Sequence, residues 1–361
     1  MKIFFDYQIF FLQKYGGISK YFIKLSEYLN RNSNEANILA PINKNSYCQD
    51  TKYKNIIRGV NFKEYPRYTG KIINFINSKF TDIYLNNSEL DVLHLTYYNK
   101  TYKIKKKITK ILTVYDLIHE KFFSYYGKKS IKPKQNAINF SDHIICISKN
   151  TQNDLINIYN VDKSKTSVIY LGVEKDEFKD KIKLNKPSIL YVGDRKRYKN
   201  FNNFVKAYSL SKFVNQNLNI ICFGGGKFSN DEIKYFKSLK LDQNKFEQIN
   251  GDDDLLKKYY RSCEFLIVPS IYEGFGLPII EAMASGCPVL CSNLGSLPEV
   301  ANNAAIYFEP TNIESIKTTM ENFINKSDEK ENIILKGYEN IKNFTWDKCA
   351  SNTLEIYKKL Q

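Results

Sequence analysis

The sequence is poor in the residues that build zinc sites and disulfide frameworks. Its 361 residues include three histidines and seven cysteines, and the cysteines form no C-x-x-C pair. An odd number of scattered cysteines argues against a disulfide scaffold and favours a reducing compartment. Several of them, Cys146, Cys222, Cys287 and Cys291, lie in or beside apolar runs, where a thiol behaves as a small hydrophobic group. The histidines are too far from paired thiols to indicate a zinc site.

Long apolar runs and targeting segments are also missing from the sequence. No apolar run approaches the roughly 18 residues of a transmembrane helix. The first residues, MKIFFDYQIFF, resemble a signal peptide only in part, because Asp6 interrupts them and no small-residue cleavage site follows. We therefore expect a cytoplasmic protein. Its 43% hydrophobic and 25% charged residues are typical of a globular chain, and the length favours two domains.

The chain carries an excess of basic residues, which is concentrated in its first half. Lys and Arg number 54 against 38 Asp and Glu, a formal net charge of +16, and residues 1–180 hold 29 basic against 17 acidic side chains. This excess indicates an anionic partner, although a general bias toward lysine explains it equally well. No DNA- or RNA-binding motif accompanies the charge, so we expect no nucleic-acid partner. The basic stretch comprises Lys103, Lys105, Lys106, Lys107, Lys110, Lys128, Lys129, Lys132 and Lys134.

Short apolar, β-branched runs alternate with longer helical patterns along the whole chain. This alternation predicts an α/β protein with parallel sheets whose strands are covered by helices on both faces. The pattern restarts after a charged stretch without periodicity, so we expect two doubly wound, Rossmann-like domains, residues 1–172 and 188–343, joined by a linker at 173–187 and facing a central cleft. Residues 344–361 predict an amphipathic helix that packs back on the first domain or ends the second.

The most informative segment is SIYEGFGLPIIEAMASGCPVLCSNLGSLPEV, residues 270–300. The turn Glu273-Gly274-Phe275-Gly276 follows a predicted strand, and Pro278 suits the first turn of the helix after it. Backbone N–H groups at such a junction, together with the positive end of the helix, favour a phosphate or diphosphate. Glu281 lies about one turn inside this helix, and carboxylates beside an anion site suit the hydroxyls of a sugar or ribose.

This segment closely resembles the Glu, seven residues, Glu motif of retaining GT-B glycosyltransferases, in particular glycosyltransferase family 4. The resemblance extends over essentially the whole chain, through GGISKYFIKLSEYL, TVYDLIHEKFF, HIICISKNTQNDLINIY, SVIYLGV, YVGDRKRYKNF and FTWDKCA in family order. It is greatest for bacterial enzymes that build surface polysaccharides such as O-antigen and capsule, often mannosyltransferases. It implies an N-terminal acceptor-binding domain and a C-terminal domain that binds the nucleotide sugar. Because the lysines of the basic stretch cluster beyond the general bias, we expect the N-terminal domain to lie on the anionic inner face of the bacterial plasma membrane.

The resemblance also implies roles for individual residues. Glu273 matches the glutamate at the donor sugar, Glu281 matches the one that binds the ribose, and Arg195 and Lys199 match the basic pair on the diphosphate, with Lys196 or Arg197 as possible substitutes. On the donor side it adds Gly16 and Gly17 of the N-terminal glycine loop and Gly274, Phe275, Gly276 and Leu277 of the loop whose amides face sugar and diphosphate. In the first domain we expect His119 to be catalytic and Asp116, Lys128 and Lys129 to lie on the acceptor side, although Tyr115 stands where many relatives have a histidine.

The resemblance implies transfer of a hexose with retained configuration, without metal or cofactor, from a nucleotide sugar, with GDP-mannose as first expectation, to a saccharide acceptor that is lipid-linked. A sugar-nucleotide epimerase or hydrolase of the same fold and a non-catalytic nucleotide-sugar binder remain alternatives. Asp252-Asp253-Asp254 is similar to a metal-binding D-x-D signature, but helix capping explains it better. Gly224-Gly225-Gly226 predicts a turn between a strand and a helix, because the third glycine of G-x-G-x-x-G is absent.

Overall fold

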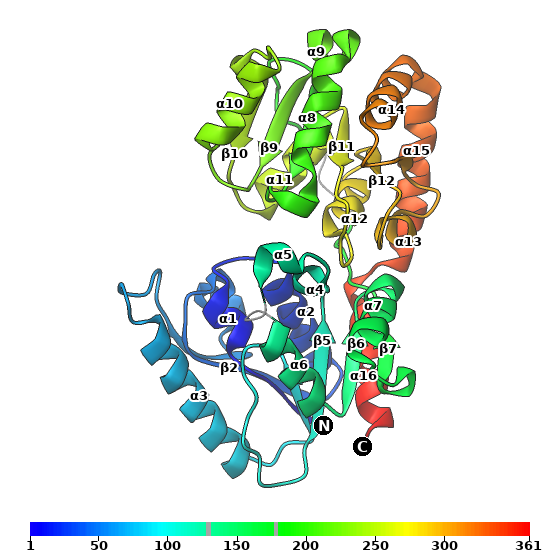
Figure 1. The fold of residues 1–361 in the computed structure, drawn as a ribbon. Helices are drawn as coiled ribbons and strands as arrows, with labels where there is room; N and C mark the ends of the chain where they lie inside the picture. Colours follow the sequence, from blue (N-terminus) through cyan, green and yellow to red (C-terminus); the bar gives the residue numbers. More distant parts are fainter. Residues whose placement is uncertain (128–130, 177–179) are drawn as a thin grey trace. The chain divides into compact units, whose positions relative to one another are not determined.

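A computed structural model gives the structure of residues 1–127, 131–176 and 180–361, without the side chains of residues 327 and 328. The chain divides into two compact units, and Figure 1 shows each as a sheet with helices around it. The first unit contains residues 1–172 and 346–361, and the second contains residues 173–345. The residues that follow Gly172, expected to form a linker, are thus part of the second unit.

The first unit is built on a seven-stranded parallel sheet with the strand order β3-β2-β1-β4-β5-β6-β7. Strands β4 and β6 are buried along their whole length, as apolar runs covered on both faces should be. The strands are β1 (Lys2–Phe5), β2 (Glu35–Asn43), β3 (Ile57–Asn61), β4 (Val92–Leu95), β5 (Thr109–Val114), β6 (His143–Cys146) and β7 (Thr166–Val168).

The helices of the first unit include one that returns from the far end of the sequence. This helix, α16 (Trp346–Lys359), packs against α2 (Gly17–Arg31). The other helices of this unit are α1 (Gln8–Leu12), α3 (Gly70–Asn87), α4 (Ile118–Lys121), α5 (Phe123–Tyr126), α6 (Ile131–Phe140) and α7 (Lys149–Tyr159).

A buried histidine joins α16 to the sheet of the first unit. His94 on β4 shares a hydrogen bond of 2.5 Å with the Tyr357 hydroxyl through Nδ1, and one of 2.8 Å with the Thr113 hydroxyl through Nε2. Burial lowers the pKa of His94 to about 3, because the apolar surroundings disfavour the charged ring. This histidine is therefore a neutral member of the core.

The second unit has a six-stranded parallel sheet with the order β10-β9-β8-β11-β12-β13. Its core is rich in aromatic side chains, and Phe236 and Phe246 stack there with ring centroids 4.1 Å apart. The strands are β8 (Ser188–Val192), β9 (Asn219–Phe223), β10 (Phe246–Ile249), β11 (Phe265–Val268), β12 (Val289–Ser292) and β13 (Ile306–Phe308).

The helices of the second unit flank this sheet (Figure 1). Residues at the two ends of the unit meet, because the Val173 N–H donates to the Phe344 carbonyl at 2.8 Å. The helices are α8 (Phe201–Leu210), α9 (Lys212–Asn217), α10 (Asn230–Ser238), α11 (Asp253–Ser262), α12 (Leu277–Ala284), α13 (Leu297–Ala301), α14 (Ile313–Asn325) and α15 (Ser327–Asn340).

Both sheets reverse their strand order at one point, which confirms the prediction of two doubly wound α/β units. The reversal lies between β1 and β4 in the first sheet and between β8 and β11 in the second. In folds of this kind, ligands bind beyond the carboxyl ends of the strands at that point, since the connecting loops diverge there. These two places are where functional side chains should be sought.

Two further observations bear on the expectations from composition. All seven cysteines are free thiols; six are buried, and Cys48 is half-buried. Burial raises the pKa of the Cys222 thiol to about 12, which suits a small hydrophobic group in a core. Within the described parts of the chain, every helix is too short or too polar to span a lipid bilayer.

Candidate active site

Two loops meet at the reversal point of the second sheet. The first follows β8 and contains the single-turn helix η5 (Arg197–Lys199), and the second follows β11. Asn200 fixes the first loop to the second, because its side-chain amide donates to the Pro269 carbonyl at 3.0 Å and the Pro310 carbonyl at 2.7 Å. The Ile271 N–H also donates to the Tyr198 carbonyl at 2.7 Å. These hydrogen bonds hold the two loops against each other.

Lys199 and Glu273, to which the family resemblance assigns roles at the donor, form an ion pair between these loops. The Lys199 Nζ lies 2.7 Å from the Glu273 Oε1, and both side chains are mostly buried, with 19% and 13% exposed. The Ser270 hydroxyl donates to the same carboxylate oxygen at 2.7 Å, and the Ser296 hydroxyl donates to the Glu273 carbonyl at 2.9 Å. A fixed cation and a fixed carboxylate thus stand side by side at the reversal point.

The glycine turn after Glu273 leads into the N-terminus of α12. Gly276 has a φ of +95°, and a Cβ at this position would lie 2.7 Å from Leu297 Cδ2, so the turn requires glycine. Phe275 is buried and packs edge-on against Phe344, with ring centroids 5.8 Å apart. Leu277 begins the helix, and Pro278 lies in its first turn as predicted. The positive end of α12 therefore starts four residues after Glu273.

Glu281 lies one turn further into α12 and is held by α11. The Tyr260 hydroxyl donates to the Glu281 Oε2 at 3.2 Å, and Tyr260 is almost fully buried. Burial first, and then the negative charge of Glu281, raise the pKa of Tyr260 well above its usual value. Tyr260 therefore remains a hydrogen-bond donor that orients this carboxylate.

Arg195 lies after β8 and is enclosed by the glycine triplet that follows β9. Its Nε lies 2.7 Å from the Glu232 Oε1, and its other nitrogens donate to the Gly224, Gly226 and Lys227 carbonyls at 2.9–3.2 Å. Only 6% of Arg195 is exposed. Its role on a diphosphate stays a prediction. The contacts described here show that Arg195 stabilises the loop after β9.

The glycine triplet is the turn that its sequence predicts. All three of its glycines have φ between +70° and +83° and lie between β9 and α10. A Cβ on Gly225 would lie 2.6 Å from the Gly193 carbonyl oxygen and 2.8 Å from the Arg195 Nη1. Burial opposes ionisation of Glu232, but hydrogen bonds from Arg195 and Ser229 outweigh it and lower the pKa of the carboxyl.

The aspartate triplet caps a helix, as predicted. The Asp252 Oδ1 accepts a hydrogen bond of 2.9 Å from the Leu255 N–H and is the N-cap of α11. Asp253 and Asp254 lie in the first helical turn, where negative charge favours the helix dipole.

The predicted residues of the first unit lie directly after β5. The Asp116 Oδ1 accepts from the Ile118 N–H at 3.0 Å, so this side chain stabilises the turn into α4. His119 is half-buried, with its ring centroid 4.5 Å from that of Tyr126. Burial, together with the positive charge of Lys134, lowers the pKa of His119, so the ring is neutral at neutral pH. Tyr115 is buried and its hydroxyl lies 3.4 Å from the Thr96 carbonyl.

One lysine of the basic stretch is buried, which corrects its assignment to a charged surface. Lys134 is 2% exposed, and its Nζ lies 2.9 Å from the Glu120 Oε2 and 2.9 Å from the Asp116 carbonyl. The Tyr159 hydroxyl donates to the other oxygen of Glu120 at 2.6 Å. The partners of Lys134 lie in α4 and in the turn before it, and α7 supplies Tyr159 to Glu120. Lys134 therefore stabilises the packing of α6 and is not available to an anionic surface.

The glycine loop near the N-terminus precedes α2 as expected. Gly16 is the N-cap of α2, and its carbonyl accepts a hydrogen bond of 2.9 Å from the Ser19 hydroxyl. Gly17 is the first residue of the helix. Lys128 and Lys129, expected on the acceptor side, lie outside the described residues.

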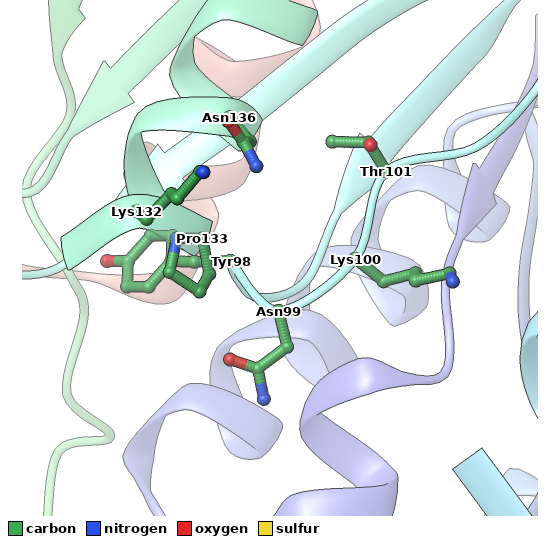
Figure 2. A pocket seen from close by; sticks show the side chains of 7 residues that line it. All are labelled: Tyr98, Asn99, Lys100, Thr101, Lys132, Pro133 and Asn136. Atoms are coloured by element: carbon green, nitrogen blue, oxygen red, sulfur yellow. The ribbon is translucent and has the colours of Figure 1, made fainter. Parts of the chain in front are cut away.

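A pocket of about 560 Å³ opens in the first unit between the loop after β4 and α6. Figure 2 shows the side chains of Tyr98, Lys132 and Pro133 close together on one side of the pocket. Besides these, Asn99, Lys100, Thr101 and Asn136 line it. Amide and hydroxyl groups beside ring faces suit a saccharide, and the two lysines suit an anionic group.

A buried carboxyl group fixes the loop that forms one wall of this pocket. Asp6 follows β1 and is fully buried, which raises its pKa. Thr96, Gln8 and Tyr102 each donate a side-chain hydrogen bond to it, at 2.5–2.9 Å. Gln8 in turn accepts from the Lys100 N–H at 2.8 Å. The pocket wall is therefore anchored at the reversal point of the first sheet.

The sequence interpretation named Lys132 only as part of the basic stretch and missed the other pocket residues. Asn99 and Lys100 follow the strand run DVLHL by only a few residues, so a search of every strand end could have found them. Ser270 lies three residues before Glu273, so the motif segment itself offered it. Glu232 and Tyr260 carry no local signal, because they approach Arg195 and Glu281 only through the fold.

Family models match both halves of the chain. Residues 15–177 match the model described as Glycosyltransferase Family 4, and residues 172–340 match the model described as Glycosyl transferases group 1. The boundary between the matches lies near the boundary between the two structural units.

Among similar proteins are two O-antigen mannosyltransferases. O-antigen chain mannosyltransferase B of Escherichia coli is 30% identical over 47% of this chain and 45% of its own length. O-antigen chain mannosyltransferase RfbU of Salmonella typhimurium is 31% identical over 57% of this chain and 55% of its own length. The chain thus spans about half the length of these curated relatives.

A solved structure shares the fold over nearly the whole chain. The crystal structure of Anabaena HepE in complex with UDP-glucose has a TM-score of 0.75 and 15% identity, and covers 99% of both chains. This likeness shows the fold alone, which is the GT-B fold. The two family models together cover residues 15–340, and they show that the chain belongs to the glycosyltransferases of family 4.

Proposed function

We propose that this chain transfers a hexose, with mannose as the first choice, from a nucleoside diphosphate sugar to a saccharide acceptor. The observation that carries the proposal is the Lys199–Glu273 pair beside the N-terminus of α12. A diphosphate needs positive charge, and a sugar needs a hydrogen-bond acceptor for its hydroxyls. The second unit offers both within one loop cluster.

In this proposal each donor group has its own partner. The diphosphate lies against the Lys199 ammonium and the N–H groups at the start of α12. Glu273 accepts hydrogen bonds from hydroxyls of the transferred sugar, and Glu281, oriented by Tyr260, accepts them from the ribose. Arg195 keeps the glycine turn after β9 in place beside this site.

We propose that the reaction retains the configuration at the anomeric carbon. The bond between the anomeric carbon and the phosphate oxygen breaks, and the acceptor oxygen attacks from the same face. The acceptor proton passes to the leaving phosphate. Negative charge grows on that phosphate as the bond breaks, so a fixed ammonium and a helix N-terminus lower the barrier without a metal ion.

The pocket in Figure 2 is our candidate for part of the acceptor site. It lies after β4, next to the reversal point of the first sheet, and Tyr98 lines it. The Tyr98 hydroxyl accepts a hydrogen bond of 2.8 Å from the Tyr115 N–H, so the pocket is joined to the strand end that carries Asp116 and His119. A lipid-linked saccharide of surface-polysaccharide synthesis is the acceptor we propose, in keeping with the names of the two mannosyltransferase relatives.

A donor screen followed by product analysis tests this function. Thermal stability measured with GDP, UDP and dTDP should rise with one nucleotide, because a ligand that binds only the folded state stabilises it. The matching sugar nucleotide is then incubated with lipid-linked saccharide acceptors in the presence of EDTA, and the new glycosidic bond is examined by NMR.

The outcomes separate the candidate functions. A new bond with the anomeric configuration of the donor, formed in EDTA, supports the proposal. An epimerised or hydrolysed donor without acceptor would indicate the epimerase or hydrolase, and tight nucleotide binding without turnover would indicate a binding protein. An inverted product, or dependence on added metal, would contradict the mechanism.

A further inference from the structure

Helix α3 of the first unit exposes more large apolar side chains than it buries. Its buried residues are Ile73, Asn77, Ser78, Thr81 and Leu85, whereas four large apolar side chains face solvent. A helix packed on a sheet normally buries its apolar stripe and exposes its polar one. The exposed apolar side chains are Ile72 at 62%, Phe75 at 61%, Phe80 at 58% and Ile83 at 60%.

The buried face of α3 carries a polar centre because Asn77 completes the hydrogen bonding of the sheet. Strand β2 has an irregular register between Leu39 and Ile42, which frees backbone groups there. The side-chain amide of Asn77 accepts from the Ile42 N–H and donates to the Ile42 carbonyl, each at 2.8 Å. These bonds fix which side of α3 faces β2, beside which the helix lies in Figure 1. The apolar stripe is therefore exposed to solvent.

The exposed stripe covers one side of the helix. Residues 72, 75 and 83 lie within a narrow arc at 3.6 residues per turn, and residue 80 borders it. Tyr68, which is 96% exposed, comes just before the helix. An apolar surface of this kind in a water-exposed helix marks an interaction site.

Positive charge surrounds the stripe. Between residues 58 and 87 the chain has five basic and two acidic side chains. Lys79 lies within the stripe, with its Nζ 5.6 Å from the centre of the Phe75 ring. Lysine side chains at a lipid interface typically lay their aliphatic carbons on the apolar surface and keep the ammonium group at its edge.

Hydrogen bonds also attach part of the basic stretch to α3. The Asn86 amide donates to the Lys103 carbonyl and accepts from the Lys105 N–H, each at 2.9 Å, and Asp82 accepts from the Lys103 N–H at 3.2 Å. The exposed lysines of this segment therefore stand beside the C-terminal half of the helix. They are Lys103, Lys105, Lys106 and Lys107.

We propose that α3 docks on the surface of an anionic lipid bilayer, with Ile72, Phe75, Phe80 and Ile83 inserted among the lipids and the surrounding lysines on the headgroups. This deepens the proposed function, since it names the contact surface through which the enzyme would reach a lipid-linked acceptor. A second copy of the chain is a poorer occupant, because a symmetric contact would bring two rims of like positive charge together.

Vesicle sedimentation tests the docking surface. The full chain is mixed at low salt with phosphatidylcholine vesicles, with or without phosphatidylglycerol. We expect binding to the anionic vesicles, and about tenfold or more weaker binding for F75S/I83S, since each lost apolar side chain removes insertion energy. L210S/L335S is the matched control, because these leucines are 54% and 64% exposed in the second unit. K71Q/K79Q should weaken binding and flatten its salt dependence.

Three results would overturn the proposal. Equal binding to neutral and anionic vesicles would show that the lysines do not bind anionic headgroups. If F75S/I83S and L210S/L335S lost the same amount of vesicle binding, α3 would not be the specific contact surface. A dimer detected by light scattering that F75S/I83S dissociates would make a second copy the occupant. Nucleotide binding, measured separately on the same variants, reports on the proposed function, so failure of transfer and failure of docking are distinguishable.

Discussion

Replacing Glu273 by glutamine should separate the binding of the nucleotide from the transfer of the sugar. In the ligand-free protein the Lys199 ammonium is engaged by the Glu273 carboxylate at 2.7 Å, and a diphosphate would compete for it. Glutamine keeps the shape and can still accept the hydrogen bond from Ser270, but it releases the lysine. The pair is neither exposed nor deeply buried, so we take its strength as about 1 kcal/mol, between the values for surface and buried pairs.

Glu273→Gln should therefore bind the nucleoside diphosphate about three- to tenfold more tightly, while its turnover falls because the sugar loses a charged partner. Lys199→Met is the matched variant and should bind the nucleoside diphosphate about 10- to 100-fold more weakly, as expected for a lost hydrogen bond between charged groups. Isothermal titration with the nucleotide found in the donor screen gives both affinities. Equal weakening in the two variants would refute the reasoning, because it would mean that the carboxylate does not compete for Lys199.

Three further predictions concern stability, measured by urea denaturation. Lowering the pH from about 8 to about 5 should lower the free energy of unfolding by about 2 kcal/mol through His94. The pKa of His94 is near 3 in the folded protein, below its usual value of 6.5, so the unfolded chain takes up the proton first. In His94→Gln the loss on acidification should be smaller by that amount. Arg195→Met leaves Glu232 with its hydrogen bond from the Ser229 N–H but without its cation, and removes one donor from each of three carbonyls. It should lower the free energy of unfolding by about 3 kcal/mol, and unchanged stability would contradict this stabilising role. Asp252→Ala should cost about 1 kcal/mol through loss of the cap, whereas Asp254→Ala, whose side chain is exposed, should cost much less.

The sequence predicts the framework of the proposed donor site because that framework is local. Glu273, Gly276, Pro278 and Glu281 lie within nine residues, and a strand, a glycine turn and a helix place them whatever the rest of the chain does. Lys199 lies outside this segment, and only the family resemblance of YVGDRKRYKNF singles it out. It meets Glu273 because β8 and β11 are neighbours and the carboxyl ends of parallel strands lie at one edge of the sheet.

Other features depend on contacts that local patterns do not encode. Lys134 belongs to a basic stretch by sequence, yet Glu120 and the Asp116 carbonyl neutralise and bury it. The periodicity of residues 70–87 is compatible with either face turned inward, and the decision comes from the Asn77 bonds to β2. Which face of this helix is buried is thus set by hydrogen bonds to another element, and the pattern of the helix alone cannot show it.

The return of α16 to the first unit has a consequence for synthesis of the chain. The helix supplies Tyr357 to His94, but it is translated only after all of residues 173–345. A nascent chain can therefore complete the second unit while the first still lacks a piece of its core. Domains usually fold in the order in which they leave the ribosome. Here the first unit cannot complete its fold until residues 346–361 have been made. During that interval the surface reserved for α16 is exposed, so the amino-terminal unit is the part most in need of chaperones.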